Sequence, residues 1–339
     1  MNKQKITYAL TMAAFLGSAA LFPASASEIQ SVGNGAFSDT NVQATSNNAS
    51  NVQQNNTTQA TNNVQTSADT GNNTASFNTG SVVNTQTGGA NATVGVTNMA
   101  GSNTANVAGS GGAGTQNVVA AGNGAFSNTE VNTNNSSTST VDQATKTDFT
   151  NNVAVNNTTG NNGANFNTGS DVNVNTGNAN AFVGIVNAAG SNTAQVAGNG
   201  STGTSNVAVA GNGAFSNNNV GVNSNNSSSL NQSNITKIAN DVALSNSTGG
   251  NGASFNTGSN VNVLSGGANS QVGITNLAGG NNAFIAGTGN NSSAGTNVTL
   301  LGNGAFSQNN VTAKNDLRSA LVQNNLSYVA NYLTTMNST

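Results

Sequence analysis

The chain has 339 residues, of which only 4% are charged, with a formal net charge of −3 and neither histidine nor cysteine. Ser-His-Asp and Cys-His catalytic groups and the usual His or Cys zinc sites are therefore excluded, and there is no basic surface for nucleic acid. We expect no catalytic, cofactor or metal site, and we predict that the protein is not an enzyme.

The first 26 residues have the pattern of a signal peptide. Lys3 and Lys5 precede an apolar run over 6–22, and Ala24-Ser25-Ala26 satisfies the small-x-small rule for signal peptidase. The run is short and interrupted by polar residues, and no later segment is apolar enough to span a bilayer. We expect residues 1–26 to be removed and the mature chain, without a membrane span, to be secreted to the extracellular space or the cell surface.

The hexapeptide Gly-Asn-Gly-Ala-Phe-Ser occurs four times and divides the remaining chain into tandem repeats. Its copies begin at Gly33, Gly122, Gly211 and Gly302, so the spacings are 89, 89 and 91 residues. Self-similarity at a fixed period is typical of repeat proteins. The predicted units are repeat 1 at 33–121, repeat 2 at 122–210, repeat 3 at 211–301 and a partial fourth repeat at 302–339.

Within a repeat, apolar residues alternate with polar or small ones, as they do around Val172 and Val174. A period of two predicts β-strands. The segments between them, such as 159–163 and 176–178, are rich in Gly and Asn, which are typical turn residues. The only proline, Pro23, precedes the repeats, so every residue of the repeats can donate its backbone N–H to a ladder. The sequence predicts an all-β fold.

Two architectures fit this pattern: an elongated β-solenoid, in which the repeats stack as coils, and a string of tandem β-sandwich domains. A sandwich fills a gap of ~10 Å between its sheets with large side chains, whereas the inward positions here are mainly Ala and Val. Asparagine, about a fifth of the chain, can form ladders of side-chain amides between stacked coils. We favour the solenoid. Disorder is a third interpretation because the aliphatic content is low, but low net charge and strict alternation argue against it.

The last segment of the chain has a different pattern. Leu317, Leu321, Val329 and Leu333 fall at helical spacings, with charged residues nearby. We expect a helical C-terminal cap over 313–335, because stacked repeats need terminal units that close the open edge. The same helix would alternatively dock a partner.

Two sets of phenylalanines recur at equivalent positions of the repeats. Alternation places them on the same face as Ala and Val, so we expect them to stack as aromatic ladders inside the solenoid. The alternative is a row of exposed rings that bind carbohydrate. The candidate ladder residues are Phe37, Phe126, Phe215 and Phe306 in the first set and Phe77, Phe166 and Phe255 in the second.

The Gly/Asn-rich turns, the Val-x-Val strand segments and the low charge resemble bacterial fibre-forming surface proteins of the functional-amyloid type, such as curlin-like and Fap-like subunits. The regular Ser…Gln-x-Gly-x-x-Asn-x-Ala spacing of curlins is absent, and the 89-residue period is longer. The resemblance implies self-assembly into matrix fibres, adhesion and biofilm support. We therefore expect a secreted structural protein that associates with itself and with other surface or matrix components. The alternative is a monomeric surface adhesin or glycan-binding β-solenoid module.

Overall fold

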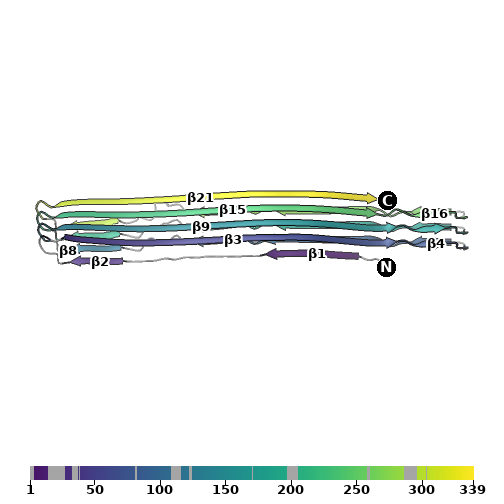
Figure 1. Cartoon of the computed structure of the whole chain (residues 1–339), viewed down its shortest axis with the longest axis horizontal. Helices are drawn as coiled ribbons and strands as arrows, with labels where there is room; N and C mark the ends of the chain where they lie inside the picture. The colour runs from purple at the N-terminus through teal and green to yellow at the C-terminus, as the bar shows by residue number, and fades with distance from the viewer. Residues whose placement is uncertain are drawn as a thin grey trace.

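The computed structural model describes residues 4–13, 27–32, 37, 39–80, 82–107, 116–121, 124–169, 171–196, 205–257, 260–285, 296–302 and 304–339. Across these ranges every helix or strand is a β-strand, so the described fold is all-β, as the alternating sequence predicts. The longest dimension of the molecule runs along the strands, which lie one above another in a thin stack (Figure 1).

Four long strands dominate the fold: β3 (Asp39–Gly71), β9 (Asn128–Gly160), β15 (Asn217–Ser247) and β21 (Gln308–Ser338). β1 (Gln4–Ala13) and β2 (Ser27–Val32) precede them. Five short strands follow each of the first three long strands. These are β4 (Thr74–Ser76), β5 (Val82–Gln86), β6 (Ala90–Ala100), β7 (Asn103–Val107) and β8 (Gln116–Ala121); β10 (Gly163–Asn165), β11 (Asp171–Asn175), β12 (Ala179–Ala188), β13 (Asn192–Val196) and β14 (Ser205–Ala210); and β16 (Gly252–Ser254), β17 (Asn260–Leu264), β18 (Ala268–Leu277), β19 (Asn281–Ile285) and β20 (Thr296–Leu301).

The described strands pair in parallel, and equivalent strands of successive repeats are neighbours. The sheet of long strands has the order β21-β15-β9-β3, and β2-β8-β14-β20 and β1-β6-β12-β18 are two of the other sheets. Asp39 pairs with Asn128 and Asn128 with Asn217, a shift of 89 residues, whereas Asn217 pairs with Gln308, a shift of 91. The register therefore follows the spacing of the hexapeptide.

The chain runs out along a long strand and the short strand that follows it, turns back, and returns through four more short strands before the next long strand begins (Figure 1). We call one such passage a coil. This arrangement is compatible with a β-solenoid. The alternative of tandem β-sandwich domains is wrong, because each described strand pairs with a strand of another repeat or of the N-terminal segment and none pairs within its own repeat.

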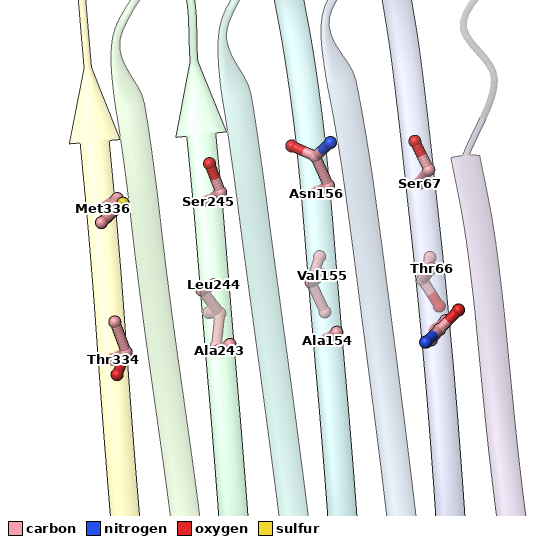
Figure 2. A pocket seen from close by; sticks show the side chains of 11 residues that line it. Thr66, Ser67, Ala154, Val155, Asn156, Ala243, Leu244, Ser245, Thr334 and Met336 are labelled. Carbon is pink, nitrogen blue, oxygen red and sulfur yellow. The ribbon is translucent and has the colours of Figure 1, made fainter.

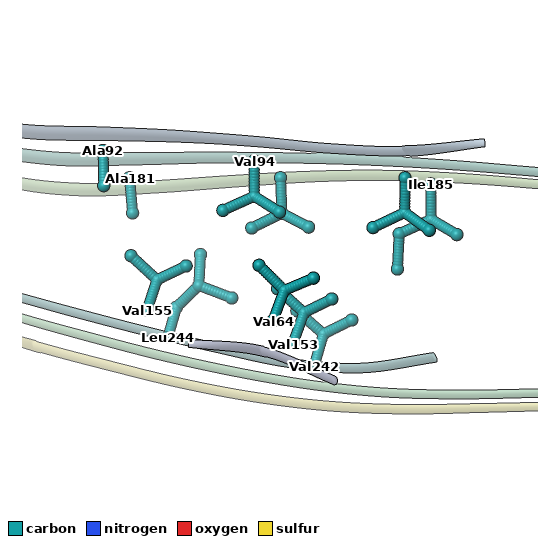
Figure 3. Packing of buried hydrophobic residues seen from close by; sticks show 11 residues of the cluster. Val64, Ala92, Val94, Val153, Val155, Ala181, Ile185, Val242 and Leu244 are labelled. Carbon is teal, nitrogen blue, oxygen red and sulfur yellow. The ribbon is translucent and has the colours of Figure 1, made fainter. Parts of the chain in front are cut away.

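Small apolar side chains fill the space between the layer of long strands and the layer of short strands. Val64, Val153 and Val242 occupy equivalent positions of β3, β9 and β15 and face Val94 and Ile185 of the opposite layer (Figure 3). Along β9 buried and more accessible residues alternate almost without interruption. Burial of one face of each strand is the reason that the register is well defined, since a one-residue slip would expose the whole apolar set.

Glycine ends the first two long strands. Gly71 and Gly160 have φ angles of 143° and 121°, in a region that favours glycine. A Cβ on Gly71 would also collide with the carbonyl oxygen of Gly160, and a Cβ on Gly160 would collide with that of Gly249. The stacked backbones are therefore close enough at this turn to require glycine in successive coils.

The expected helical cap over 313–335 is wrong, because the segment lies inside the 31-residue strand β21, which pairs with β15 along its whole length. Leu321, Val329 and Leu333 share one face of this strand, and Leu326 and Tyr332 share the other, as the period of two requires. The residues that suggested a helix, Leu317, Leu321, Val329 and Leu333, are spaced by multiples of four, which fits one face of a strand as well as one face of a helix. The open edge of β15 then provides backbone partners that an isolated helix would not have.

The start of the chain is described only in part. Residues 4–13 form β1, which pairs in parallel with β6, whereas the expected cleavage site at Ala24–Ala26 lies outside the described residues. In the part of the chain that the structure describes, no helix is long and apolar enough to cross a membrane.

Candidate assembly interface

Two columns of asparagines, buried except at the C-terminal end of the stack, meet between the two layers. Asn151 of β9 donates from Nδ2 to Oδ1 of Asn240 at 2.7 Å and to Oδ1 of Asn187, in the opposite layer, at 3.1 Å. Its Oδ1 accepts from Asn62 and from Asn98, both at 2.8 Å. All donor and acceptor sites of this buried amide are thus used. The column of the long strands comprises Asn62, Asn151, Asn240 and Asn331, and the column of β6, β12 and β18 comprises Asn98, Asn187 and Asn276.

The hydrogen bonds in these two columns all have the same direction. Asn98 donates to Asn187 at 2.7 Å, and Asn187 donates to Asn276 at 2.8 Å. Asn240 donates at 2.7 Å to Asn331, which also accepts from Asn276 at 3.1 Å. Each amide nitrogen therefore points toward the C-terminal end of the stack and each amide oxygen toward the N-terminal end.

A column of glutamines, of which Gln143 and Gln232 are buried, has the opposite direction. Gln143 donates to Gln54 at 2.7 Å, Gln232 to Gln143 at 2.8 Å, and Gln323 to Gln232 at 2.8 Å. Gln143 also donates to the backbone oxygen of Thr193 in the opposite layer at 3.1 Å. These bonds join neighbouring coils and join the two layers, and they leave the Gln column with its oxygen toward the C-terminal end.

Further columns confirm that asparagine ladders, expected from the composition, stabilise the stack. Asn103 donates to Asn192 at 3.0 Å and to the backbone oxygen of Ala144 at 2.8 Å. Hydrogen bonds inside a dry interior are stronger than those in water. The other columns with amides donating in this direction include Asn73–Asn162–Asn251, Asn78–Asn167–Asn256 and Asn157–Asn246–Asn337.

The seven candidate phenylalanines stack as two ladders on the surface. The rings of Phe126 and Phe215 are 5.1 Å apart with an interplanar angle of 5°, and those of Phe166 and Phe255 are 4.9 Å apart. Their expected position in the interior is wrong, because even Phe166, between two other rings, is 48% exposed. All seven have positive φ, between 55° and 64°. This left-handed turn takes each ring out of the alternation from which an interior position was inferred.

Substitutions of Phe215 separate the contribution of ring stacking from the cost of backbone strain. The ring of Phe215 stacks at 5.1 Å on Phe126 and on Phe306, and we expect Phe215→Ala to lower the free energy of unfolding by about 1–3 kcal/mol, at roughly 0.5–1.5 kcal/mol per ring pair. Phe215→Gly should lose about 1 kcal/mol less, because glycine adopts positive φ without strain. Urea unfolding followed by circular dichroism measures both, and equal losses would contradict a strained turn at this position.

The strand β21 is an open, long and unusually apolar sheet edge at the C-terminal end of the stack (Figure 1). Its outward face carries apolar side chains that are each more than half exposed: Val322, Leu326, Tyr328, Tyr332 and Met336. The paired residues of β15 are Asn231, Ile235, Lys237, Asp241 and Ser245, respectively. A long exposed edge with apolar side chains is a template for pairing with another chain. The edge is therefore a candidate interface rather than a closed end.

A groove crosses the long strands near the C-terminal end of β21 (Figure 2). One side is a row of equivalent residues formed by Ser67, Asn156, Ser245 and Met336. Small residues such as Ala154 leave the space beside that row. The groove follows the stacking direction, so it is a consequence of the columns and would lengthen with the stack.

Charged groups contribute little to this surface. In the described chain one ion pair is present, between Arg318 Nη2 and Asp316 Oδ2 at 2.8 Å on β21. The hydrogen bonds that the Arg318 guanidinium donates to the carboxylate of Asp316, and then the Coulomb attraction between the two groups, raise the pKa of Arg318 above its ordinary value. Exposed pairs of this kind stabilise proteins only slightly. Within the described ranges no three His, Cys, Asp or Glu residues lie close enough together to hold a metal ion.

Two features of the interface are absent from the sequence-based expectations. The pairing of Asn98 with Asn151 across the layers joins residues 53 apart, and no period of the sequence indicates which short strand faces which part of a long strand. The apolar outward face of β21 was visible in the sequence but resembled a helix. Tyr328 is equivalent to Asp148 and Lys237 of the preceding repeats. A comparison of these three positions would have indicated that an aromatic residue replaces a charged one on the surface of a strand.

No protein-family model matches the chain, and comparisons with curated proteins and with solved structures find no similar protein.

Proposed function

We propose that this chain is a secreted structural subunit that assembles with itself into extracellular fibres or matrix. In this proposal each repeat of about 89 residues forms one coil of a β-solenoid, residues 1–26 direct export, and the protein acts by assembly and not by catalysis. The lack of histidine and cysteine supports a non-catalytic role, because the commonest nucleophile, base and zinc-ligand chemistry is missing.

The observation that carries the proposal is the open edge of β21. It exposes one side of a 31-residue strand, which at ~3.3 Å per residue is about 100 Å of backbone donors and acceptors. Natural proteins usually protect such an edge with charges, prolines or a covering element. Here the chain has no proline after Pro23, and only Lys314, Asp316 and Arg318 are charged in β21. Low charge and strong strand tendency are also the sequence signature of ordered fibre formation.

Electron microscopy of the purified chain after incubation at neutral pH tests the proposal. We expect filaments, and fibre diffraction from them should show a meridional spacing of ~4.7 Å from strands perpendicular to the fibre axis. Particles that remain monomeric for days, at concentrations at which a fibre subunit would assemble, would refute the proposal.

A further inference from the structure

We propose that neighbouring chains join head to tail by sharing one level of the stack, which β21 of one chain and β2 of the next form together. β21 of one chain pairs in parallel with β3 of the next chain, and β2 of the next chain lies on β20 of the first, opposite β21. This inference rests on the proposed function and specifies the polarity and register of the fibre.

The two ends of the stack are complementary in their strands. Among the described residues, the C-terminal end finishes with the long strand β21, and no return strand lies above β17–β20. The N-terminal end begins with β1, which belongs to the segment that we expect to be removed, and with β2, a return strand of the β8 sheet, before the first long strand. When the ends meet, β21 and β2 therefore occupy the same level of the stack. Neither strand needs to move, because the sheet of long strands and the β8 sheet both continue in the order that they already have inside one chain.

The edge of β21 has its hydrogen-bonding groups in the required positions. The backbone nitrogen of Gln308 donates to Ser216 at 2.8 Å, and the backbone oxygen of Ser338 accepts from Thr248 at 2.9 Å. In a parallel ladder the N–H and C=O of alternate residues point to the same neighbour. The backbone N–H and C=O groups of even-numbered residues of β21 thus point toward β15. Those of odd-numbered residues point toward the open edge, where β3 of the next chain would pair.

The amide columns determine the direction of joining. Asn331 accepts two hydrogen bonds from the coil below it, and the polarity of its column directs its Nδ2 toward the open edge. The equivalent residue of β3 is Asn62, whose Nδ2 donates to Asn151 and thus has the same polarity. Gln323 and Gln54 are the two ends of the glutamine column, which would continue from one chain to the next with the opposite polarity. A contact between two C-terminal edges would pair β21 antiparallel with itself, and the columns would not continue.

The phenylalanine ladder predicts the same register. Phe306 at the C-terminal end is 82% exposed and Phe37 at the N-terminal end is 77% exposed, compared with 52% for Phe126 and Phe215 between them. Each terminal ring has one uncovered face. Stacking of Phe37 from the next chain on Phe306 continues the 5.1 Å spacing of the ladder and places Gln59 of that chain beside Tyr328.

Head-to-tail contacts that do not close into a ring produce filaments. Each chain then adds four long strands, so at ~4.8 Å per strand the axial rise per chain is about 19 Å. This rise is four times the strand spacing, because β21 of one chain and β2 of the next lie at the same level of the stack, and we call this level the shared coil.

Disulfide trapping tests the register, since the chain has no cysteine of its own. The single variants Gln59→Cys and Tyr328→Cys are mixed, assembled and oxidised with glutathione disulfide. Both residues lie on the outward face and are exposed, and in adjacent paired strands their Cα atoms would be within the 4.4–6.8 Å that a disulfide permits. We expect a heterodimer in the mixture and no dimer from either variant alone. Thr45→Cys mixed with Tyr328→Cys is the matched control, because Thr45 is on the same face of β3 but 14 residues out of register.

Dimers from a single variant, or equal trapping with Thr45→Cys, would overturn the head-to-tail register. Micrographs of the same samples separate this inference from the proposed function. Filaments without the Gln59–Tyr328 heterodimer would overturn the shared coil and leave the structural-subunit proposal in place. A lack of filaments together with a lack of heterodimer would overturn both.

Discussion

Replacing Asn151 with aspartate should lower the free energy of unfolding by about 3–5 kcal/mol, the cost of leaving an unpaired charge in a protein interior. The side chain of Asn151 is fully buried, and its Nδ2 donates to Asn187 and Asn240. A carboxylate has the same shape but cannot donate, so one of its oxygens would face two amide oxygens. Both hydrogen bonds would become repulsive contacts in a medium that screens poorly. Urea unfolding followed by circular dichroism measures the loss.

Asn156→Asp is the matched control for this change. Asn156 lies on the same strand with its side chain exposed, between Ser67 and Ser245 of the neighbouring coils. The same chemical substitution there should change the free energy of unfolding by less than about 0.5 kcal/mol, as expected for a surface site. If the two variants unfolded at the same urea concentration, the interior amide columns would not be a main source of stability.

Two prolines on the open edge, Ser319→Pro with Ser327→Pro, should block filament growth without unfolding the chain. Odd-numbered residues of β21 direct their N–H groups away from β15, so the ladder with β15 keeps its donors. The edge loses two donors at ~1 kcal/mol each, which is a roughly 30-fold weaker contact, and the proline rings also obstruct an incoming strand. Light scattering and electron microscopy should show that the rate of filament growth is reduced by at least this factor of roughly 30.

The control for the edge variant is Ala320→Pro with Asn324→Pro, two residues of even number on the same strand. Their N–H groups point to β15, so this variant should lose internal hydrogen bonds and detach part of β21 from the stack. Circular dichroism should show less strand and a lower unfolding midpoint than in the edge variant. Normal filament growth by the edge variant would show that β21 is not the growing edge.

Much of the fold could be predicted from the sequence, because strands, turns and the pairing of equivalent strands each depend on a local pattern of residues that recurs along the chain. Alternation along the strands, glycine and asparagine in the turns and the 89-residue spacing of the hexapeptide indicate parallel pairing of equivalent strands, and pairs such as Val64 with Val153 have that shift. Asparagine ladders follow from the same repetition, since identical side chains at a fixed shift lie above one another once the coils stack.

The two predictions that were wrong, the helical cap and the interior position of the phenylalanines, have specific physical causes. In the C-terminal segment, apolar residues spaced by multiples of four fit a strand as well as a helix, and only the open edge of β15 makes a strand the better state. The phenylalanines follow an apolar alternation, but a positive φ at each ring rotates it to the surface, where it stacks on its equivalents. Neither effect is present in the spacing of residues.

The sequence by itself therefore determined the all-β class, the period and the set of residues that stack, because each depends on repetition along one chain. The tertiary structure alone decided which strands oppose one another across the interior, which brings Asn98 to Asn151, and which side of each terminal strand stays open. Those properties depend on where the chain turns back between its long strands. That geometry results from the packing of two layers and not from the order of residues in either one.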